Sequence, residues 1–576
     1  MRSSLLALLI VIMGTPVYAE SERPNIVLVM TDDQGYGDFG VHGNPIVKTP
    51  NLDRFAKEGI QFRNFYVSPV CAPTRSSLMT GRYNYRTGVV DTYLGRAMMH
   101  VDERTLAEML SQVGYRTGIF GKWHLGDNYP MRAQDQGFQE VLVHNGGGIG
   151  QPADPPGNLY TNPTLQHNGK STKYNGYCSD IFTTGAIDFI GKGDGKPFFA
   201  YIAFNCPHGP YQIADDKVKP YRGIDLSPAA FPKIGQPMRP SNPEEVARVY
   251  GMVENIDQNF GRLLAHLREQ KLADNTLVIF LTDNGPGGIR FNGGLRMAKG
   301  TVYEGGIRVP CFVQYPAKFR QPRLIDEISA HIDWVPTICD LCGIEKPGNL
   351  HWDGVSRLPL LRGDAVPASE RSLFFQWHRG DEPELYRAFA VRTPTFKLVQ
   401  ANGAGEAKNF KRNYELFDIA NDPYEMKDLA TEQPETVKKL LASYQAWFKD
   451  VSSTRGYAPP VIVLGHEKDN PSTLTRQDWR GPQAGWTPKS IGHWEVNFDR
   501  PGNYAITVNF SPSQQAEELF LDVSDTKLSK PVLQNTDKIR LVLEKLPRGN
   551  TRFSPRLKSE SGERGVDYVE VEWLSD

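Results

Sequence analysis

Charged, amide and imidazole side chains follow four apolar segments of the sequence within a few residues. The segments are "NIVLVMT", "TGIF", "PFFAYIAF" and "TLVIFLT". The polar residues at their ends are Asp32, Asp33, Lys122, His124, His208, Asp283 and Asn284. A single acidic residue after a strand is more often a turn former or a helix cap than a ligand. Two acidic pairs and two basic or imidazole groups in equivalent places instead indicate one shared polar site.

Four of these residues offer only oxygen atoms as ligands. They are Asp32, Asp33, Asp283 and Asn284. Carboxylates and amide carbonyls are the ligands of hard cations such as Ca²⁺ and Mg²⁺, and they suit zinc poorly. Ca²⁺ tolerates irregular geometry and more protein ligands than Mg²⁺ does, so we expect Ca²⁺. The cation would offset the repulsion among the three carboxylates.

A lone cysteine opens a predicted helix in "SPVCAPTRSSLMTGR". Pro73 near the start and Gly81 at the end predict a short helix that begins just after Cys71. A helix N-terminus lowers the pKa of a thiol, which would suit a cysteine nucleophile. A cysteine-dependent phosphatase loop, however, needs an arginine six positions after the cysteine, where Ser77 stands. A thiolate also matches a hard cation badly, so an oxygen nucleophile would fit the neighbouring site better.

This segment closely resembles the signature of the formylglycine-dependent sulfatases, a family of the alkaline phosphatase superfamily. In that family the cysteine of C-x-P-x-R is converted to formylglycine, whose hydrated aldehyde supplies an oxygen nucleophile. The resemblance covers roughly residues 23 to 450. The other segments that carry it are "RPNIVLVMTDDQGYGDFG", "GKWHLG", "PHGPY", "TDNGP", "KGTVYEGGIRVP" and "LFDIANDPYEMKDLA".

The resemblance implies a role for each motif residue. The implied metal ligands are Asp32, Asp33, Cys71, Asp283 and Asn284. Arg75 would hold the hydroxyl of the nucleophile, and Lys122 and Lys299 would bind the sulfate oxygens. His208 would protonate the leaving oxygen, and His124 would assist the release of sulfate. The family also implies a maturation enzyme that generates the formylglycine.

Three further residues are candidates for substrate contact: Arg96, His100 and His144. The Gly/Pro-rich stretch 144–157 lacks the lysine and the helix start of a phosphate-binding loop, so we interpret it as a flexible loop. Together with the proline-rich stretch 220–243, it could shape a substrate pocket.

The alternation of apolar segments with helical patterns predicts the fold class. Continuous apolar runs are typical of strands that are buried on both faces. The helical patterns between them are "TPNLDRFAKEG", "RTLAEMLSQVG" and "VYGMVENIDQNFGRLLAHLREQ". This order predicts an α/β fold with a large mixed, mostly parallel sheet and helices on both faces, which the resemblance makes alkaline-phosphatase-like. Ligands of such sheets bind beyond the carboxyl ends of the strands, where the polar residues would meet.

The length of 576 residues predicts several domains. The expected parts are a signal peptide (1–19), an α/β catalytic domain (23–368), a smaller α+β subdomain (369–457) and an all-β accessory module (460–576). Period-2 alternation broken by turns predicts that the last part is a sandwich. Trp486, Trp494 and Trp573 could stack on sugars there, although buried core aromatics are more common.

Composition and the N-terminus indicate where the protein works. "MRSSLLALLIVIMGTPVYAE" reads as a cleaved secretory signal, which predicts export to the periplasm or the medium without a stable membrane anchor. The net charge of −1 argues against nucleic acid as a partner. Six cysteines are few for an exported chain of this size. Cys339 and Cys342 lie in a predicted helix that ends at Gly343, so we expect core thiols and not a redox pair.

The sequence therefore predicts an exported sulfatase that acts on a sulfated saccharide or an aryl sulfate. Two alternatives stay open. One is a phosphomonoesterase or phosphodiesterase of the same superfamily. The other is a glycan-binding protein without catalysis, in which Cys71 is never modified.

Overall fold

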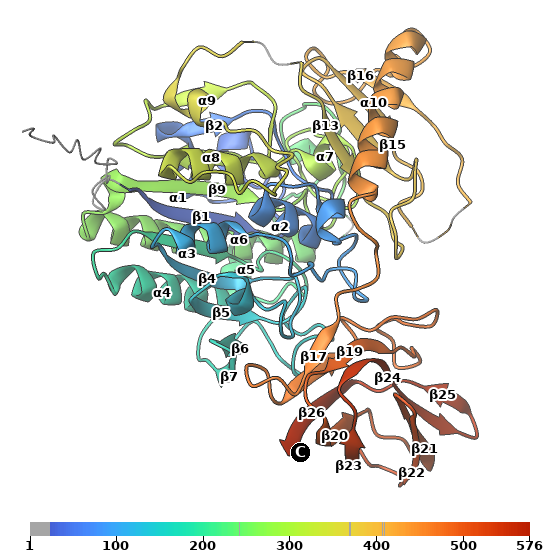
Figure 1. Cartoon of the computed structure of the whole chain (residues 1–576). Helices are drawn as coiled ribbons and strands as arrows, with labels where there is room; N and C mark the ends of the chain where they lie inside the picture. Colours follow the sequence, from blue (N-terminus) through green and yellow to red (C-terminus); the bar gives the residue numbers. More distant parts are fainter. Residues whose placement is uncertain (1–22, 241, 368–369, 406, 408, 576) are drawn as a thin grey trace, which may run out of the picture.

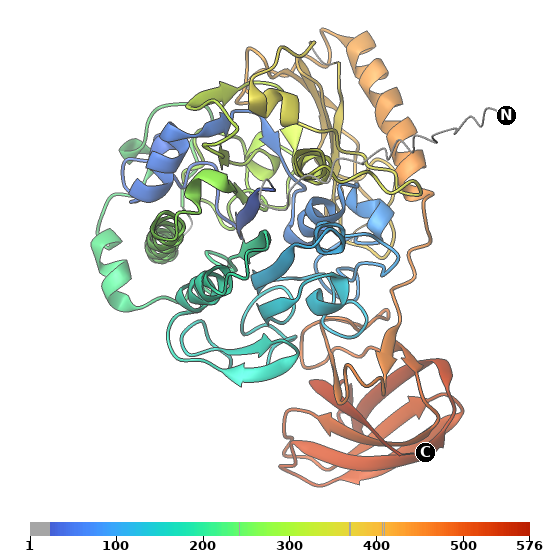
Figure 2. The ribbon, with the colours of Figure 1, turned by 60° about the vertical axis from the view of Figure 1, so that its left-hand side comes forward.

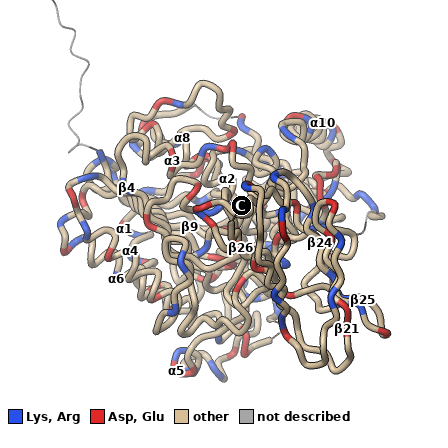
Figure 3. Tube along the Cα trace, turned by 60° about the horizontal axis from the view of Figure 1, so that its bottom comes forward, with Lys and Arg blue, Asp and Glu red and all other residues tan. Residues whose placement is uncertain are grey.

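The structure is a computed structural model with three parts, of which the β-rich C-terminal part stands out from the rest (Figures 1 and 2). It describes residues 23–240, 242–367, 370–405, 407 and 409–575. The predicted signal peptide lies outside the described residues. Within the described ranges, every helix is too short or too polar to cross a membrane. Basic and acidic residues are interspersed along the trace in Figure 3.

A ten-stranded sheet forms the centre of the largest part. In spatial order its strands are β11 (Arg323–Ile325), β2 (Ile60–Phe62), β10 (Cys311–Gln314), β9 (Thr276–Thr282), β1 (Asn25–Thr31), β8 (Phe198–Ala203), β4 (Arg116–Lys122), β5 (Glu140–His144), β6 (Thr164–His167) and β7 (Lys170–Lys173). The run β9-β1-β8-β4-β5 is parallel, and antiparallel strands flank it on both sides. The predicted mixed, mostly parallel sheet is confirmed.

Helices cover both faces of this sheet, and β1 is accordingly buried along its whole length. Leu28 and its neighbours two residues away pack into one core, beneath α2 (Cys71–Thr80), α3 (Leu106–Gln112) and α8 (Trp334–Cys342). Val27 and Val29 pack into the core on the opposite face, beneath α1 (Pro50–Glu58), α4 (Cys178–Gly191) and α6 (Pro243–Glu269). Shorter elements of this part are β3 (Phe65–Tyr66), β12 (Ser329–Ala330), α5 (Asp215–Val218), α7 (Glu304–Ile307) and α9 (Leu358–Arg362).

The CxxC segment behaves as a packing element. Helix α8 ends at Gly343, whose φ of 66° is the left-handed conformation that glycine adopts readily. Cys339 and Cys342 are buried in the core beneath it, as predicted. All six cysteines of the described chain are free thiols, and the sulfurs of Cys178 and Cys206 are 3.8 Å apart.

The second part is an antiparallel sheet of four strands with one long helix. It comprises β13 (Leu373–Gln376), β14 (Phe389–Arg392), β15 (Phe396–Gln400), β16 (Glu415–Asp418) and α10 (Pro434–Ser452). Tyr444 of α10 stacks on Phe389 with the ring centroids 3.6 Å apart. Leu440 and Trp447 join the same core, which fixes α10 against the sheet (Figure 1).

The third part, the β-module, is a sandwich of two sheets. One contains β17 (Ile462–Leu464), β19 (Trp494–Phe498), β24 (Gly549–Ser559), β21 (Glu517–Val523), β22 (Thr526–Val532) and β25 (Gly562–Arg564). The other contains β18 (Ser472–Thr475), β26 (Tyr568–Ser575), β20 (Gly502–Asn509) and β23 (Lys538–Leu546). Trp494 is fully buried between the sheets, so for this residue the core interpretation holds.

Candidate active site

The two acidic pairs meet because their strands are neighbours in register. Thr31 of β1 is paired with Thr282 of β9, so the next residues, Asp32 and Asp283, leave the sheet side by side. The amide of Asp283 donates to the carbonyl of Thr31 at 3.0 Å, and the amide of Asp32 donates to that of Cys206 at 3.1 Å. These bonds extend the strand pairing by one residue and hold both carboxylates at the rim.

The lysine and histidine of β4 reach the same rim. Lys122 is the last residue of β4 and is paired with His144 of β5. His124 follows with a φ of 60°, a left-handed conformation that is uncommon outside glycine. The glycine-rich loop packs closely on its ring: a Cβ added to Gly147 would lie 2.9 Å from the His124 ring. The glycines therefore let the loop cover the imidazole.

Arg75 joins the carboxylates to the rest of the site. It lies one helical turn after Cys71, on the same side of α2. Its guanidinium donates to Asp283 Oδ2 at 2.9 Å and to the carbonyl of Lys122 at 3.0 Å, and it lies 3.5 Å from Asp32. The ammonium of Lys122 also contacts Asp32. These buried cationic and anionic groups are thus held in fixed positions.

The carboxylate of Asp33 lies next to the side chains of Lys299, Asn284 and His208. The Nζ of Lys299 lies 2.6 Å from Asp33 Oδ1, and the amide of Asn284 donates to the same oxygen at 2.8 Å. His208 Nε2 lies 3.8 Å from Asp33 Oδ2. Asp33 also donates its backbone N–H to Asp283 Oδ1 at 3.2 Å.

The buried carboxylates of Asp32 and Asp283 have pKa values that are shifted in opposite directions. Burial by itself would raise the pKa of Asp32, but the charges of Lys122, His208 and Arg75 hold that pKa well below its usual value. Burial, and then the negative charge of Asp32, raise the pKa of Asp283 to about 7. One carboxylate of the pair is therefore ionised at the expense of the other.

The donor set fits a hard divalent cation. Asp32 Oδ1 and Asn284 Oδ1 are buried and have no hydrogen-bond partner among the described residues. Ligand atoms of Asp32, Cys71 and Asp283 lie within 4.8 Å of one another, and so do those of Asp32, Asp33 and His208. An oxygen-rich cluster with unpaired buried oxygens is the chemistry that Ca²⁺ or Mg²⁺ satisfies.

Cys71 begins α2, so the helix starts at this residue and not just after it as predicted. Pro73 is the third residue, where a missing N–H costs no helical bond. Gly81 ends the helix with a φ of 72°, as expected. The thiol is buried, and burial raises its pKa although Lys122 and Lys299 act in the opposite direction. Burial therefore outweighs the two lysines and disfavours a thiolate at this position.

Backbone carbonyls orient the two imidazoles that line the site. His124 donates from Nε2 to the carbonyl of Thr92 at 2.7 Å, and its Nδ1 is buried without a partner among the described residues. His208 donates from Nδ1 to the carbonyl of Gly209 at 2.6 Å, so Nε2 faces Asp33. Burial lowers the pKa of both imidazoles, that of His124 far below its usual value.

A cavity of about 480 Å³ opens over Cys71. His124, His208 and Lys299 line it beside the cysteine, and the glycine-rich loop adds Gln151. The side chains of His208 and Lys299 are 16% and 22% exposed, so solvent and substrate can reach them. The metal-side carboxylates lie buried below this cavity.

Two cavity residues come from the second part of the chain and were missed in the sequence. Trp377 and Arg379 follow β13 directly. The buried carboxylate of Asp91 fixes both: it accepts from Trp377 Nε1 at 3.0 Å and from Arg379 at 2.7 Å. The sequence pattern that could have found them is the one that found the other rim residues, a largely apolar strand followed by polar side chains. Here "LFFQ" is followed by "WHR".

The structure places the three candidate substrate residues outside the wall of this cavity. Arg96 pairs with Asp381 at 2.8 Å. His100 packs against Gly88, where an added Cβ would lie 2.3 Å from its ring. His144 is buried at the end of β5, where burial lowers its pKa to about 3. None of the three lines the cavity over Cys71, whereas Arg96 lines a second cavity of about 840 Å³ together with Arg379.

Known proteins match this chain over most of its length. Residues 24–344 match the Sulfatase family, and residues 296–449 match "N-sulphoglucosamine sulphohydrolase, C-terminal". Arylsulfatase A of Homo sapiens is 31% identical over 502 residues, which cover 78% of this chain and 92% of that protein. Arylsulfatase A of Bos taurus is 31% identical over 472 residues, which cover 73% of this chain and 86% of that protein. The crystal structure of Ps i-CgsB in complex with k-i-k-neocarrahexaose has a TM-score of 0.64 and 28% identity, covering 76% of this chain and 94% of that chain.

The family match spans more than half of the chain and includes the ends of β1, β4, β8 and β9. The buried acidic cluster beside Cys71 agrees with the metal and formylglycine that this family typically uses. The geometry of the site agrees with the family match and with the similarity to these relatives. The chain belongs to the sulfatase family of sulfuric ester hydrolases and resembles the arylsulfatases.

Proposed function

We propose that this chain is an exported sulfatase that removes sulfate from a sulfated saccharide, using Ca²⁺ and a formylglycine derived from Cys71. The observation that carries the proposal is the position of Cys71, at the floor of a cavity and against an oxygen-rich cluster. A saccharide is supported by the carrahexaose complex of Ps i-CgsB and by the aromatic cavity wall. The N-terminal segment supports export.

The chemistry of Cys71 supports its conversion. Burial keeps the thiol protonated, which makes it a poor nucleophile, and a soft sulfur suits the neighbouring oxygen ligands badly. A formylglycine made by a maturation enzyme would supply, as its hydrate, one hydroxyl oxygen that attacks sulfur and displaces the alcohol. Loss of the proton from the second hydroxyl would then re-form the aldehyde and expel sulfate, because the bond between the carbon and the first oxygen breaks. Arg75, one turn along α2, is placed to hold that oxygen beside Asp283.

Ca²⁺ would be held by Asp32, Asp33, Asp283 and Asn284, and it would supply positive charge for the nucleophile and the sulfate oxygens. Lys122 and Lys299 contact Asp32 and Asp33 in the present structure. We infer that the cation takes over this neutralising role, which leaves both ammonium groups to bind the sulfate group.

His208 is the best placed acid for the leaving oxygen. It lines the cavity, and its Nε2 is directed away from the carbonyl that fixes Nδ1. His124 is the second cavity imidazole, and its backbone bond leaves Nδ1 as the nitrogen that can exchange a proton with the reacting group. Both can contribute general acid–base catalysis.

A panel of sulfate esters tests the proposal. The enzyme, isolated from a host that generates formylglycine, is given defined sulfated saccharides, 4-nitrophenyl sulfate and 4-nitrophenyl phosphate. We expect the highest kcat/KM with one of the saccharides. Turnover of the aryl sulfate without any saccharide would refute the saccharide, and faster release of phosphate would favour the phosphatase alternative.

Replacing His208 separates its role from that of the lysines. A phenolate leaves without a proton, whereas a sugar alkoxide needs one. His208→Ala should therefore lower kcat/KM on the sulfated saccharide by about 10²–10⁴-fold and on the aryl sulfate much less. The measurement is kcat/KM of folded protein on both substrates.

Lys122→Ala is the matched comparison, because Lys122 is assigned to the sulfate group that both substrates share. It should reduce kcat/KM on the two substrates by similar factors. Equal losses on both substrates for His208→Ala would remove this histidine from the acid role and leave Lys299 as the next candidate.

A further inference from the structure

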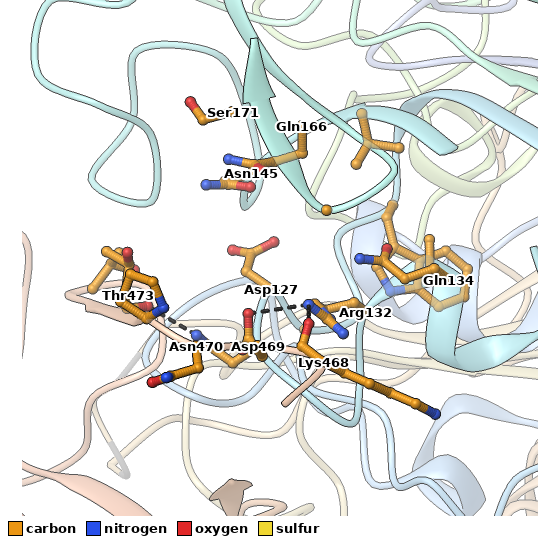
Figure 4. Close-up of a pocket in the computed structure, with 18 of the residues that line it drawn as sticks. Asp127, Arg132, Gln134, Asn145, Gln166, Ser171, Lys468, Asp469, Asn470 and Thr473 are labelled. Carbon is orange, nitrogen blue, oxygen red and sulfur yellow. Dashed lines mark hydrogen bonds and ion pairs between the residues drawn. The ribbon is translucent and has the colours of Figure 1, made fainter. Parts of the chain in front are cut away.

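The β-module is docked firmly on the α/β part. Its sandwich core includes Leu94, Met98 and Met131, which belong to the α/β part. A polar cavity of about 390 Å³ lies at this junction, and Arg132 binds Asp469 of the β-module there at 3.0 Å. Figure 4 shows the residues that line this cavity. An apolar core shared by two parts, with ion pairs around it, is typical of a rigid interface.

The docked face reaches the backbone that orients a catalytic imidazole. The side-chain amide of Gln477, in the β-module, donates to the backbone carbonyl of Thr92 at 2.9 Å. The backbone carbonyl of Gln477 accepts from the backbone amide of Gly95 at 2.9 Å. The Thr92 carbonyl is the one that also accepts from His124 Nε2. Gln477 of the β-module and His124 therefore bind the same backbone carbonyl.

One side chain of the β-module enters the cavity wall itself. Trp486 lines the cavity over Cys71, and its ring meets that of Tyr93 edge to face with centroids 5.4 Å apart. The loop that carries Trp486 is fixed, because Arg476 donates to the carbonyl of Thr487 at 3.0 Å. The indole of Trp479 donates to the carbonyl just before Trp486, at 3.1 Å.

The wall that Trp486 completes has a definite chemistry. Tyr93 and Trp377 also line it, and the guanidinium of Arg379 lies over their rings at 4.5 and 5.0 Å from the centroids. Arg379 is fixed by Asp91 and also lines a second cavity of about 840 Å³. Aromatic faces beside a fixed cation match the apolar face of a sugar ring that carries a negative substituent.

We propose that the β-module is part of the substrate site and that Trp486 is a specificity-determining residue, which packs against a sugar ring of an anionic oligosaccharide bound between Trp377, Tyr93 and Arg379. The inference rests on the proposed saccharide sulfatase function and deepens it. It assigns the β-module a place in the cavity that holds the leaving group, in contrast to a separate glycan-binding unit.

The test compares two tryptophan replacements in the full-length enzyme. Trp486→Ala should lower kcat/KM on a sulfated oligosaccharide by about 10- to 100-fold, mostly through a higher KM, because a ring contact is lost while the reacting groups stay in place. On 4-nitrophenyl sulfate the loss should be less than about 3-fold, since this small substrate does not reach a second ring site. Trp486→Phe should restore much of the activity on the oligosaccharide.

Trp573→Ala is the matched control. Trp573 belongs to the same module, but it packs against Arg500 and donates to the carbonyl of Pro501 at 3.2 Å, outside the cavity wall. It should leave kcat/KM on both substrates unchanged, with folding of both variants checked by thermal unfolding. Equal behaviour of the two alanine variants, or equal losses of Trp486→Ala on the two substrates, overturns the inference while the saccharide function stands. A wild-type enzyme that cleaves only the aryl sulfate overturns the saccharide function itself.

Discussion

Replacing Cys71 by alanine is expected to lower sulfate release by about 10⁵-fold or more, because it removes the nucleophile and leaves only binding and charge stabilisation. The fold should survive, since the thiol is small and makes no hydrogen bond that α2 needs. Activity on a saccharide and on an aryl sulfate should be lost alike. The measurement is the rate of sulfate release together with the thermal unfolding temperature.

Cys178→Ala is the matched control, because Cys178 is also a buried free thiol but lies away from the cavity over Cys71. It should keep the activity. Peptide mass spectrometry of the active wild type should find an aldehyde at position 71 in place of the thiol. A fully active enzyme with an unmodified Cys71 thiol contradicts the mechanism.

Replacing Asp283 by alanine is expected to remove both the metal and the activity, with a loss in kcat/KM of at least about 10³-fold. Asp283 lies next to Asp32, and it receives hydrogen bonds from Arg75 and from the amide of Asp33. Without it, the cation loses an oxygen ligand and Arg75 loses its partner at 2.9 Å. The metal content is measured by elemental analysis of the purified protein.

Asp257→Ala controls for the loss of any buried carboxylate. Asp257 is 1% exposed and accepts from the backbone amides of Asn51 and Leu52, outside the metal cluster. It should lower stability but leave the metal content and the kcat of the folded fraction unchanged. Calcium in about one equivalent is expected in the wild type, and stoichiometric zinc would contradict the hard-cation assignment.

The sequence alone determined the sheet and the rim residues, because both depend on short-range patterns. A strand that is buried on both faces must be continuously apolar, as β1 and β9 are. The residue after such a strand must leave the sheet at its carboxyl end, so the sequence pattern by itself placed Asp32 and Asp283 together. The ends of β4 and β8 follow the same rule.

Sequence pattern could not place the substrate-side residues. The sequence around a tryptophan does not tell whether its side chain fills a core, as Trp494 of β19 does, or lines a cavity, as Trp377 and Trp486 do. The spacing of Arg96 and His100 in the chain does not indicate where their side chains lie. In the folded chain Arg96 pairs with Asp381, and His100 packs against Gly88. The protonation of Cys71 was also beyond the sequence, because its burial depends on everything packed around α2.

The tertiary structure alone decided that the β-module reaches the cavity over Cys71. All residues that we propose to be catalytic precede this module in the chain, so linear order favours a detachable accessory unit. The contact of Gln477 with Thr92 instead joins residues 385 positions apart, through one hydrogen bond and a shared core. Local propensity and spacing do not encode such contacts. They depend on the complementary shapes of two folded surfaces, which exist only after each part has packed its own core.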